Sequence, residues 1–264
     1  MAGLSRRRSW AVGAAAIALL GAAAPAMAAD EEIQVYMDEM GDAGDIGLDI
    51  HSNYVLAGDP APAYPGAEPA LHRLRITPEW GLGLGGGFEA GLYLPLMTVA
   101  PDGVLRASGV KGRMKFIAPH EATGAFWGAN LEIGRVKYRL DQNPWNGEFK
   151  LIAGWRNDRW ELAANANIGF KVAGPVSAPA ELEIASKASY KVSDNLRLGV
   201  ESYNGVGQFQ ALGQFGQSDQ TTYLTIDALL GKWDINAGIG KGYGASSDTT
   251  VLKFVIGVPL GARL

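Results

Sequence analysis

Apolar and polar residues alternate along the chain from Asp45 onward, in runs of about 10 to 12 residues that turn-rich gaps separate. A period of two predicts a β-strand, because successive side chains of a strand point to opposite faces. In residues 160–170, Trp, Leu, Ala, Ile and Phe share one face, while Glu and Asn occupy the other. Twelve runs of this kind predict twelve strands, over residues 45–55, 70–80, 87–97, 108–118, 125–136, 147–156, 159–172, 181–192, 196–204, 219–230, 233–242 and 250–260.

Charged residues are confined to one face of these predicted strands. The apolar faces hold two charged side chains, Arg135 and Lys241, whereas the opposite faces hold 26, of which 13 are basic and 13 acidic. A soluble sandwich or barrel also alternates, with its apolar face turned inward. The lengths of the connections and the positions of the aromatic residues decide between the two orientations.

The connections alternate between long and short. The long ones are 56–69, 98–107, 137–146, 173–180, 205–218 and 243–249, and the short ones are 81–86, 119–124, 157–158, 193–195 and 231–232. Long external loops and short periplasmic turns are typical of transmembrane barrels. Asn157-Asp158 and Gly231-Lys232 have the chemistry of two-residue hairpin turns.

Aromatic residues gather on the apolar face at the strand ends next to the short turns. Aromatic rings favour the headgroup boundary of a bilayer, where barrels carry belts of them, while a soluble core has no reason to place its aromatics at one height. The residues of this predicted girdle are Trp80, Phe88, Phe116, Trp127, Trp155, Trp160, Tyr190 and Trp233.

These patterns together predict one all-β domain over residues 45–264, a transmembrane antiparallel up-and-down β-barrel of about twelve strands in the bacterial outer membrane. An even strand number lets residues 250–260 close against residues 45–55, which leaves no unpaired edge in lipid. The expected partners of such a barrel are outer-membrane lipids and the barrel-assembly machinery.

The N-terminal residues have the features of a secretory signal peptide. Arg6, Arg7 and Arg8 are followed by an apolar run of 14 residues, too short for a transmembrane helix, and then by a small-x-small site at Ala26-Met27-Ala28. We therefore expect residues 1–28 to be removed. Residues 29–44 are acidic, and we expect either a periplasmic N-terminal segment or a partial plug.

Composition excludes several classes of protein. The chain has no cysteine, which rules out disulfides, thiolate metal sites and a cysteine nucleophile. Its net charge is −4 without a large basic block, which argues against nucleic acid as a partner. The acids near the N-terminus do not match a Ca²⁺-binding loop, so the sequence predicts no metal or other cofactor.

Residues 79–95 read EWGLGLGGGFEAGLYLP, and residues 110–116 read VKGRMKF. These segments resemble the outer-membrane proteins grouped with the meta-pathway of phenol degradation, in which a short glycine turn precedes a strand of similar pattern. The resemblance covers about 40 residues, and the Gly-Asp pair usual before the second strand is lacking. It implies a transporter of small, often aromatic compounds.

The polar face of the predicted strands would line the lumen. A barrel of this size lies between one filled by side chains and one with an aqueous channel. Either the lumen is a narrow pore, in which Lys111, Arg113 and Lys115 attract an anionic or polar solute, or it is sealed by ion pairs, with Lys111 opposite Glu132 and Lys187 opposite Glu201. The predicted lining residues are Arg73, Arg75, Glu89, Lys111, Arg113, Lys115, Glu132, Lys150, Glu161, Lys171, Lys187 and Glu201.

The preferred prediction is therefore passive passage of small polar, anionic or aromatic solutes, with a sealed structural barrel as the alternative. The proline-rich residues 59–70 should be stiff, and residues 205–218 are a candidate for folding inward. A lipid-modifying enzyme is a further alternative, since Ser52 and His72 would lie side by side on the outer face if the register shifted. A third group that orients the histidine is missing from the neighbouring strands, so no enzyme is predicted.

Overall fold

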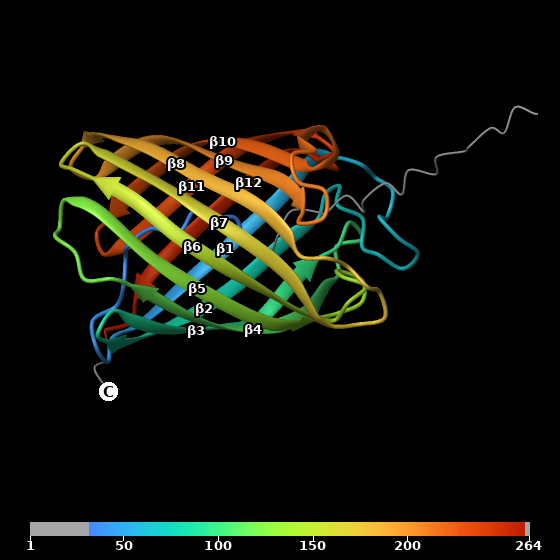
Figure 1. The fold of residues 1–264 in the computed structure, drawn as a ribbon, viewed down its shortest axis with the longest axis horizontal. Coiled ribbons are helices and arrows are strands. Elements are labelled where there is room, and N and C mark those ends of the chain that lie inside the picture. The colour runs from blue at the N-terminus through green and yellow to red at the C-terminus, as the bar shows by residue number, and fades with distance from the viewer. Residues whose placement is uncertain (1–31, 262–264) are drawn as a thin grey trace, which may run out of the picture.

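The computed structural model describes residues 32–261, in which twelve antiparallel strands form one closed barrel (Figure 1). The predicted signal peptide lies outside the described residues. Each strand pairs with its neighbours in sequence, and the last strand closes against the first, so the wall has no unpaired edge. The strands are β1 (Ile46–Gly58), β2 (Leu74–Gly85), β3 (Phe88–Val99), β4 (Leu105–Ile117), β5 (Gly124–Val136), β6 (Trp145–Arg156), β7 (Trp160–Ala173), β8 (Glu181–Ser193), β9 (Leu196–Gln208), β10 (Asp219–Leu230), β11 (Trp233–Gly244) and β12 (Asp248–Pro259), and one turn of 3-10 helix, η1, spans Phe215–Gln217.

The two ends of the barrel differ, as the connection lengths predict. The long loops gather at one end, and the short turns lie at the other with the C-terminal residues (Figure 1). A two-residue turn, at Gly231 and Lys232, joins β10 and β11 with Leu230 opposite Trp233. Gly231 has a φ of 69°, a conformation that glycine adopts without strain. Within residues 32–261, no helix is long and apolar enough to cross a membrane.

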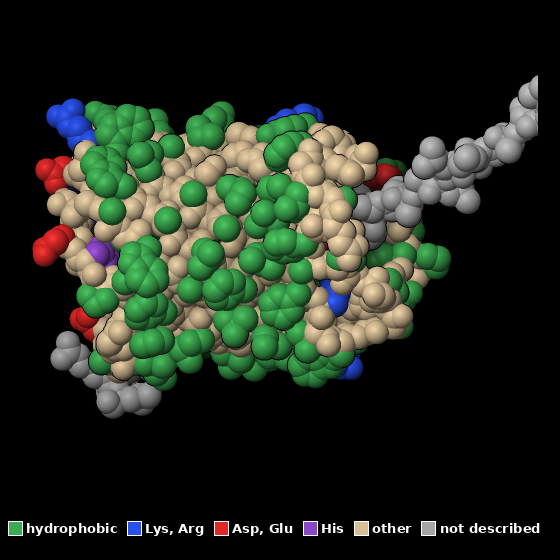
Figure 2. Space-filling model, in the orientation of Figure 1, with side chains coloured by type: hydrophobic (Ala, Val, Ile, Leu, Met, Phe, Trp, Pro, Cys, Tyr) green, Lys and Arg blue, Asp and Glu red, His purple; other side chains and the backbone are tan. Residues whose placement is uncertain are grey.

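The apolar face of the strands points outward. Figure 2 shows hydrophobic side chains over the middle of the barrel wall and charged ones toward its ends. Leu224 is 67% exposed and Ile239 50%, whereas the alternate residues Tyr223 and Thr225 are 2% and 4% exposed. A soluble barrel would bury the first pair. The transmembrane orientation predicted from the connection lengths and the aromatic girdle is thus confirmed.

Among the strand boundaries, the end of β2 differs most from the prediction. The glycine-rich run after Trp80 was expected to be a turn, but β2 continues to Gly85, because Gly81 pairs with Gly47 and with Gly91. The connection to β3 is only Gly86 and Gly87, both with positive φ. A Cβ on Gly87 would lie 2.3 Å from the carbonyl oxygen of Ile117, so only glycine fits there.

The register of two hairpins also tests the predicted charge pairs. Lys187 lies opposite Glu201, as predicted. Lys111 lies opposite Gly134, and Arg113 is the residue opposite Glu132. The expected pairing of Lys111 with Glu132 is therefore wrong by two residues. The β4–β5 register begins only at Gly128, which lies opposite Ile117, because the residues of β5 from Gly124 onward pair with β6 alone until that point.

Candidate functional site: the lumen and the segment inside it

All twelve predicted lining residues lie on the inner face of the wall. Seven of them are buried, namely Arg73, Arg75, Glu89, Lys115, Glu132, Lys150 and Glu201. The other five, Lys111, Arg113, Glu161, Lys171 and Lys187, are partly buried. Strand parity places them there, since each shares its face with the buried residues of its own strand.

The eight predicted girdle residues lie on the outer face. Six are between 40% and 61% exposed, and Phe116 and Tyr190 are partly covered by their neighbours. Phe116 packs against Phe88 with 4.8 Å between the ring centroids, and Tyr190 against Trp160 with 4.9 Å. Trp80 does not lie at a strand end as predicted, because β2 continues for five residues beyond it.

Ion pairs connect side chains of the inner face, both within a strand and between strands. Arg113 binds Glu79 and Glu89, and Lys150 lies 2.5 Å from Glu148 and 3.6 Å from Glu132. On the opposite side, Lys187 binds Asp227 at 2.9 Å and lies 3.8 Å from Glu201. A single glutamate, Glu201, also binds Lys253. Glu79, Asp227 and Lys253 were missed as site residues, although the same parity places them on this face.

The segment before β1 lies inside the barrel. Residues 32–44, here called the lumenal segment, have Val35, Tyr36 and Met37 only 3–4% exposed. These three residues pack against an apolar patch of the wall near the short turns, made by Ile117, Phe126, Ile152, Ala163 and Ala185. Farther along the lumen, Ile33 packs against Val55, Tyr223 and Val251. Of the two predictions for this segment, these contacts fit a partial plug and not a free periplasmic segment.

Tyr36 is the most extensively bound residue of the lumenal segment. Its backbone N–H donates to Asn165 Oδ1 at 2.6 Å, and its carbonyl oxygen accepts from Asn165 Nδ2 at 2.9 Å. Its hydroxyl lies 2.7 Å from that of Tyr93 and donates to Glu132 at 3.1 Å. The cationic groups of Arg113, Lys115 and Lys150 lie 5.9, 5.2 and 4.5 Å from the centre of its ring. An aromatic side chain thus occupies the place that two members of the predicted basic triplet, Arg113 and Lys115, would offer to a solute.

Charged groups hold the lumenal segment at the rim with the short turns. Asp38 binds Arg156 and lies 2.8 Å from His120, while Glu39 binds Arg156 at 2.9 Å. Lys115 donates to the carbonyl oxygen of Glu39 at 2.8 Å. The pKa of His120 is raised above its ordinary value, first by the carbonyl oxygen of Ala118 and then by Asp38. The protonated form of His120 therefore favours the bound segment.

At the long-loop end of the barrel, two loops contact each other. Tyr64 donates a hydrogen bond of 2.6 Å to the carbonyl oxygen of Tyr138, and Glu68 binds Arg139 at 2.9 Å. The proline-rich loop between β1 and β2 thus contacts the loop between β5 and β6. Residues 205–218, the candidate for folding inward, do not do so, because β9 continues to Gln208 and Phe209 and Phe215 are 49% and 54% exposed.

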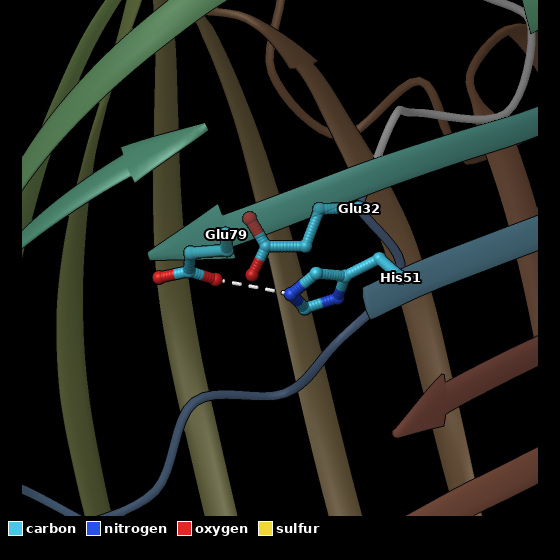
Figure 3. Close-up of side chains that lie close together, drawn as sticks. All are labelled: Glu32, His51 and Glu79. Carbon is cyan, nitrogen blue, oxygen red and sulfur yellow. Dashed lines mark hydrogen bonds and ion pairs between the residues drawn. The ribbon is translucent and has the colours of Figure 1, made fainter. Parts of the chain in front are cut away.

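A cluster of ionisable groups connects the lumenal segment to the wall at the middle of β1. Glu32, His51 and Glu79 converge from the segment, β1 and β2 (Figure 3). His51 Nε2 lies 3.0 Å from Glu79 Oε2. Strand parity places both His51 and Glu79 on the inner face, whereas the approach of Glu32 depends on the path of the lumenal segment.

The candidate serine–histidine pair is not formed. Ser52 lies opposite Ile76 on one side and Phe254 on the other. His72 belongs to the turn before β2, where its ring stacks on Tyr54 with 6.2 Å between the centroids. The two residues therefore lack the hydrogen bond that nucleophilic catalysis requires.

Comparison with known proteins relates the fold to a set of solved structures. No family model and no curated protein matches the sequence. The COG4313 outer membrane channel from Pseudomonas putida F1 superposes with a TM-score of 0.58 at 11% identity, over 86% of this chain and 99% of that one. The KdgM porin gives 0.55 at 12% identity, over 81% and 99%, and the NanC porin 0.53 at 8%, over 81% and 100%. The resemblance to the phenol-degradation proteins stays a prediction, and the chain has the fold of bacterial outer-membrane channel barrels.

Proposed function

We propose that the protein is an outer-membrane channel for small polar, anionic or aromatic solutes, and that the lumenal segment closes it in the state described. The charged inner wall carries this proposal. Buried ion pairs contribute little net stability, and well-packed apolar residues in their place are often as stable or more so. A barrel that served only as a scaffold would gain little stability from a wall of Arg, Lys and Glu.

The position of Tyr36 supports the choice of solute. Its ring lies among three cationic groups, and its hydroxyl and backbone are all hydrogen-bonded to the wall. Once the segment has left, an aromatic solute could take the place of the ring, and an anionic solute could pair with the cationic groups of Arg113, Lys115 and Lys150. Most of these contacts are polar and exchangeable with water, which suits a segment that is bound reversibly.

The contacts of Val35 and Met37 favour a second candidate, a permanently sealed structural barrel. Both side chains pack against apolar wall residues, and their removal into water would expose that surface. Electrical recording distinguishes the two candidates, because a sealed barrel carries no current under any condition that leaves it folded.

The test is the single-channel current of the refolded mature chain and of Arg156→Gln in planar bilayers. The substitution removes the pairs of Arg156 with Asp38 and Glu39. A charged hydrogen bond is worth about 1.5–3 kcal/mol, so the open probability should rise about 10-fold or more. Arg159→Gln is the matched control, because Arg159 lies at the same rim and binds Tyr190 instead. Silence of the wild type and of Arg156→Gln would establish the sealed barrel.

The same recordings test the solute class. In the Arg156→Gln background, the open channel should prefer anions, and Lys111→Ala/Arg113→Ala/Lys115→Ala should shift the reversal potential toward cations. Unchanged conductance and selectivity in the triple variant would show that these three residues do not attract the solute.

A further inference from the structure

Three metal-ligating side chains meet where the lumenal segment crosses β1 and β2. One donor atom from each of Glu32, His51 and Glu79 lies within 4.8 Å of the other two. His51 and Glu79 are 1% and 3% exposed, while Glu32 is partly exposed. Figure 3 shows the carboxylate of Glu32 beside the imidazole of His51 and the carboxylate of Glu79. Because the three residues are far apart in sequence, only the folded lumenal segment brings them together.

Neighbouring groups orient both carboxylates, each through one of its oxygens. The hydroxyl of Tyr93 donates to Glu32 Oε2 at 2.9 Å, and Nε of Arg113 donates to Glu79 Oε1. Glu32 Oε1 has no hydrogen-bond partner among the described residues. Glu79 Oε2 and His51 Nε2 are hydrogen-bonded to each other. Supporting hydrogen bonds of this kind are characteristic of metal sites, where they fix the ligand groups.

Charge and donor type indicate the ligand. Two carboxylates that approach each other in a poorly hydrated lumen repel, and a divalent cation relieves this repulsion. Mg²⁺ and Ca²⁺ prefer sets of oxygen ligands, whereas an imidazole nitrogen favours zinc and similar transition metals. We propose that Glu32, His51 and Glu79 bind a divalent transition-metal ion of the zinc class, which connects the lumenal segment to the wall.

The geometry requires a small adjustment. Ligand atoms at about 2.0–2.2 Å from a tetrahedral zinc ion lie about 3.4 Å from one another. His51 Nε2 and Glu79 Oε2 are 3.0 Å apart, close to this separation. The donor atom of Glu32 lies within 4.8 Å of both, and a rotation of its flexible side chain would bring it to the same separation. One imidazole and two carboxylates leave the fourth position to water.

Binding is tested on the refolded mature chain without a histidine tag, by titration with Co²⁺ and displacement with Zn²⁺. One equivalent of Co²⁺ should give the visible absorption of a tetrahedral site. His51→Gln should weaken binding by at least about 100-fold, since loss even of a group that only supports a ligand costs about 10–100-fold. His72→Gln is the matched control and should bind normally, because His72 lies in the turn before β2, where its ring stacks on Tyr54.

Glu32→Gln separates a bridge from a site on the wall alone. Residue 32 precedes the strands, so this variant leaves the barrel to fold, and it should also bind Co²⁺ more weakly. Full occupancy in His51→Gln or in Glu32→Gln, or no stoichiometric binding by the wild type, would overturn the proposal.

The regulatory consequence rests on the proposed channel function. A metal that ties the segment to the wall should lower the open probability, and a chelator should raise it, in the wild type but not in Glu32→Gln. Co²⁺ binding at His51 without current in any condition would refute the channel and leave the metal site intact. Current that is insensitive to the chelator, with metal bound, would refute only the regulation.

Discussion

At the scale of single residues, charged groups at the rim and hydrogen bonds farther inside both attach the lumenal segment to the wall. Asp38 meets Arg156 and His120 at the rim, and Tyr36 meets Asn165 farther inside. His120 is the titratable member of the rim group, because its partners Ala118 and Asp38 raise its pKa. The strength of the attachment should therefore depend on pH.

The sign of this dependence follows from the raised pKa. Protonated His120 binds Asp38, so its contribution is complete below the ordinary histidine value of about 6.5 and is lost as pH rises through the raised pKa. We expect the open probability to increase over this interval. Recordings at stepped pH check it, and in His120→Gln the increase should vanish. An increase of equal size in His120→Gln would assign the effect to another group.

Strand parity predicted the lining residues but not their contacts with the lumenal segment. Parity depends on each strand alone, whereas the position of Tyr36 depends on the closed barrel around it. A signal was nevertheless present. Ile33, Val35 and Met37 are apolar at alternate positions within an acidic stretch, and all three are buried. Such alternation indicates an extended segment with one covered face.

At the scale of elements, the strands were predictable and their exact pairing was less so. The two-residue turn at Gly231 fixes the register of β10 and β11, and all its residues pair as expected. The longer connection between β4 and β5 does not fix the register of these two strands in the same way. Within it, His120 turns toward the lumenal segment, and its ring centroid lies 5.9 Å from that of Phe126. Contacts made far along the chain thus set the register where the turn is loose.

The outward face of β10 offers a test of the membrane orientation. Leu224 lies mid-strand and Leu230 at the short-turn end, and both are more than 60% exposed. Leu224→Arg should lower the free energy of unfolding from lipid by about 2–4 kcal/mol, and Leu230→Arg by about 0–1 kcal/mol, because a basic residue is costly only at the bilayer centre. Equal, small effects in denaturant titrations would mean that this face contacts water.

At the scale of the whole molecule, the barrel combines an apolar exterior with a charged lumen that part of its own chain fills. The first feature is required by the membrane, whereas the second contributes little net stability to the barrel. Fold alone does not decide function, since the same barrel architecture can carry different sites. The behaviour of the lumenal segment is therefore what distinguishes a channel from a sealed barrel.

The most direct measurement is the reaction of Val35→Cys with a charged thiol reagent during bilayer recording. The chain has no cysteine and Val35 is 3% exposed, so the new thiol is unique and covered. A reversibly closed channel predicts slow reaction, about 10-fold faster reaction when Arg156→Gln is added, and a lasting rise in current, because a charged adduct cannot return to the apolar patch. Equal reaction rates in both backgrounds, with the current unchanged, would contradict closure of the channel by the lumenal segment.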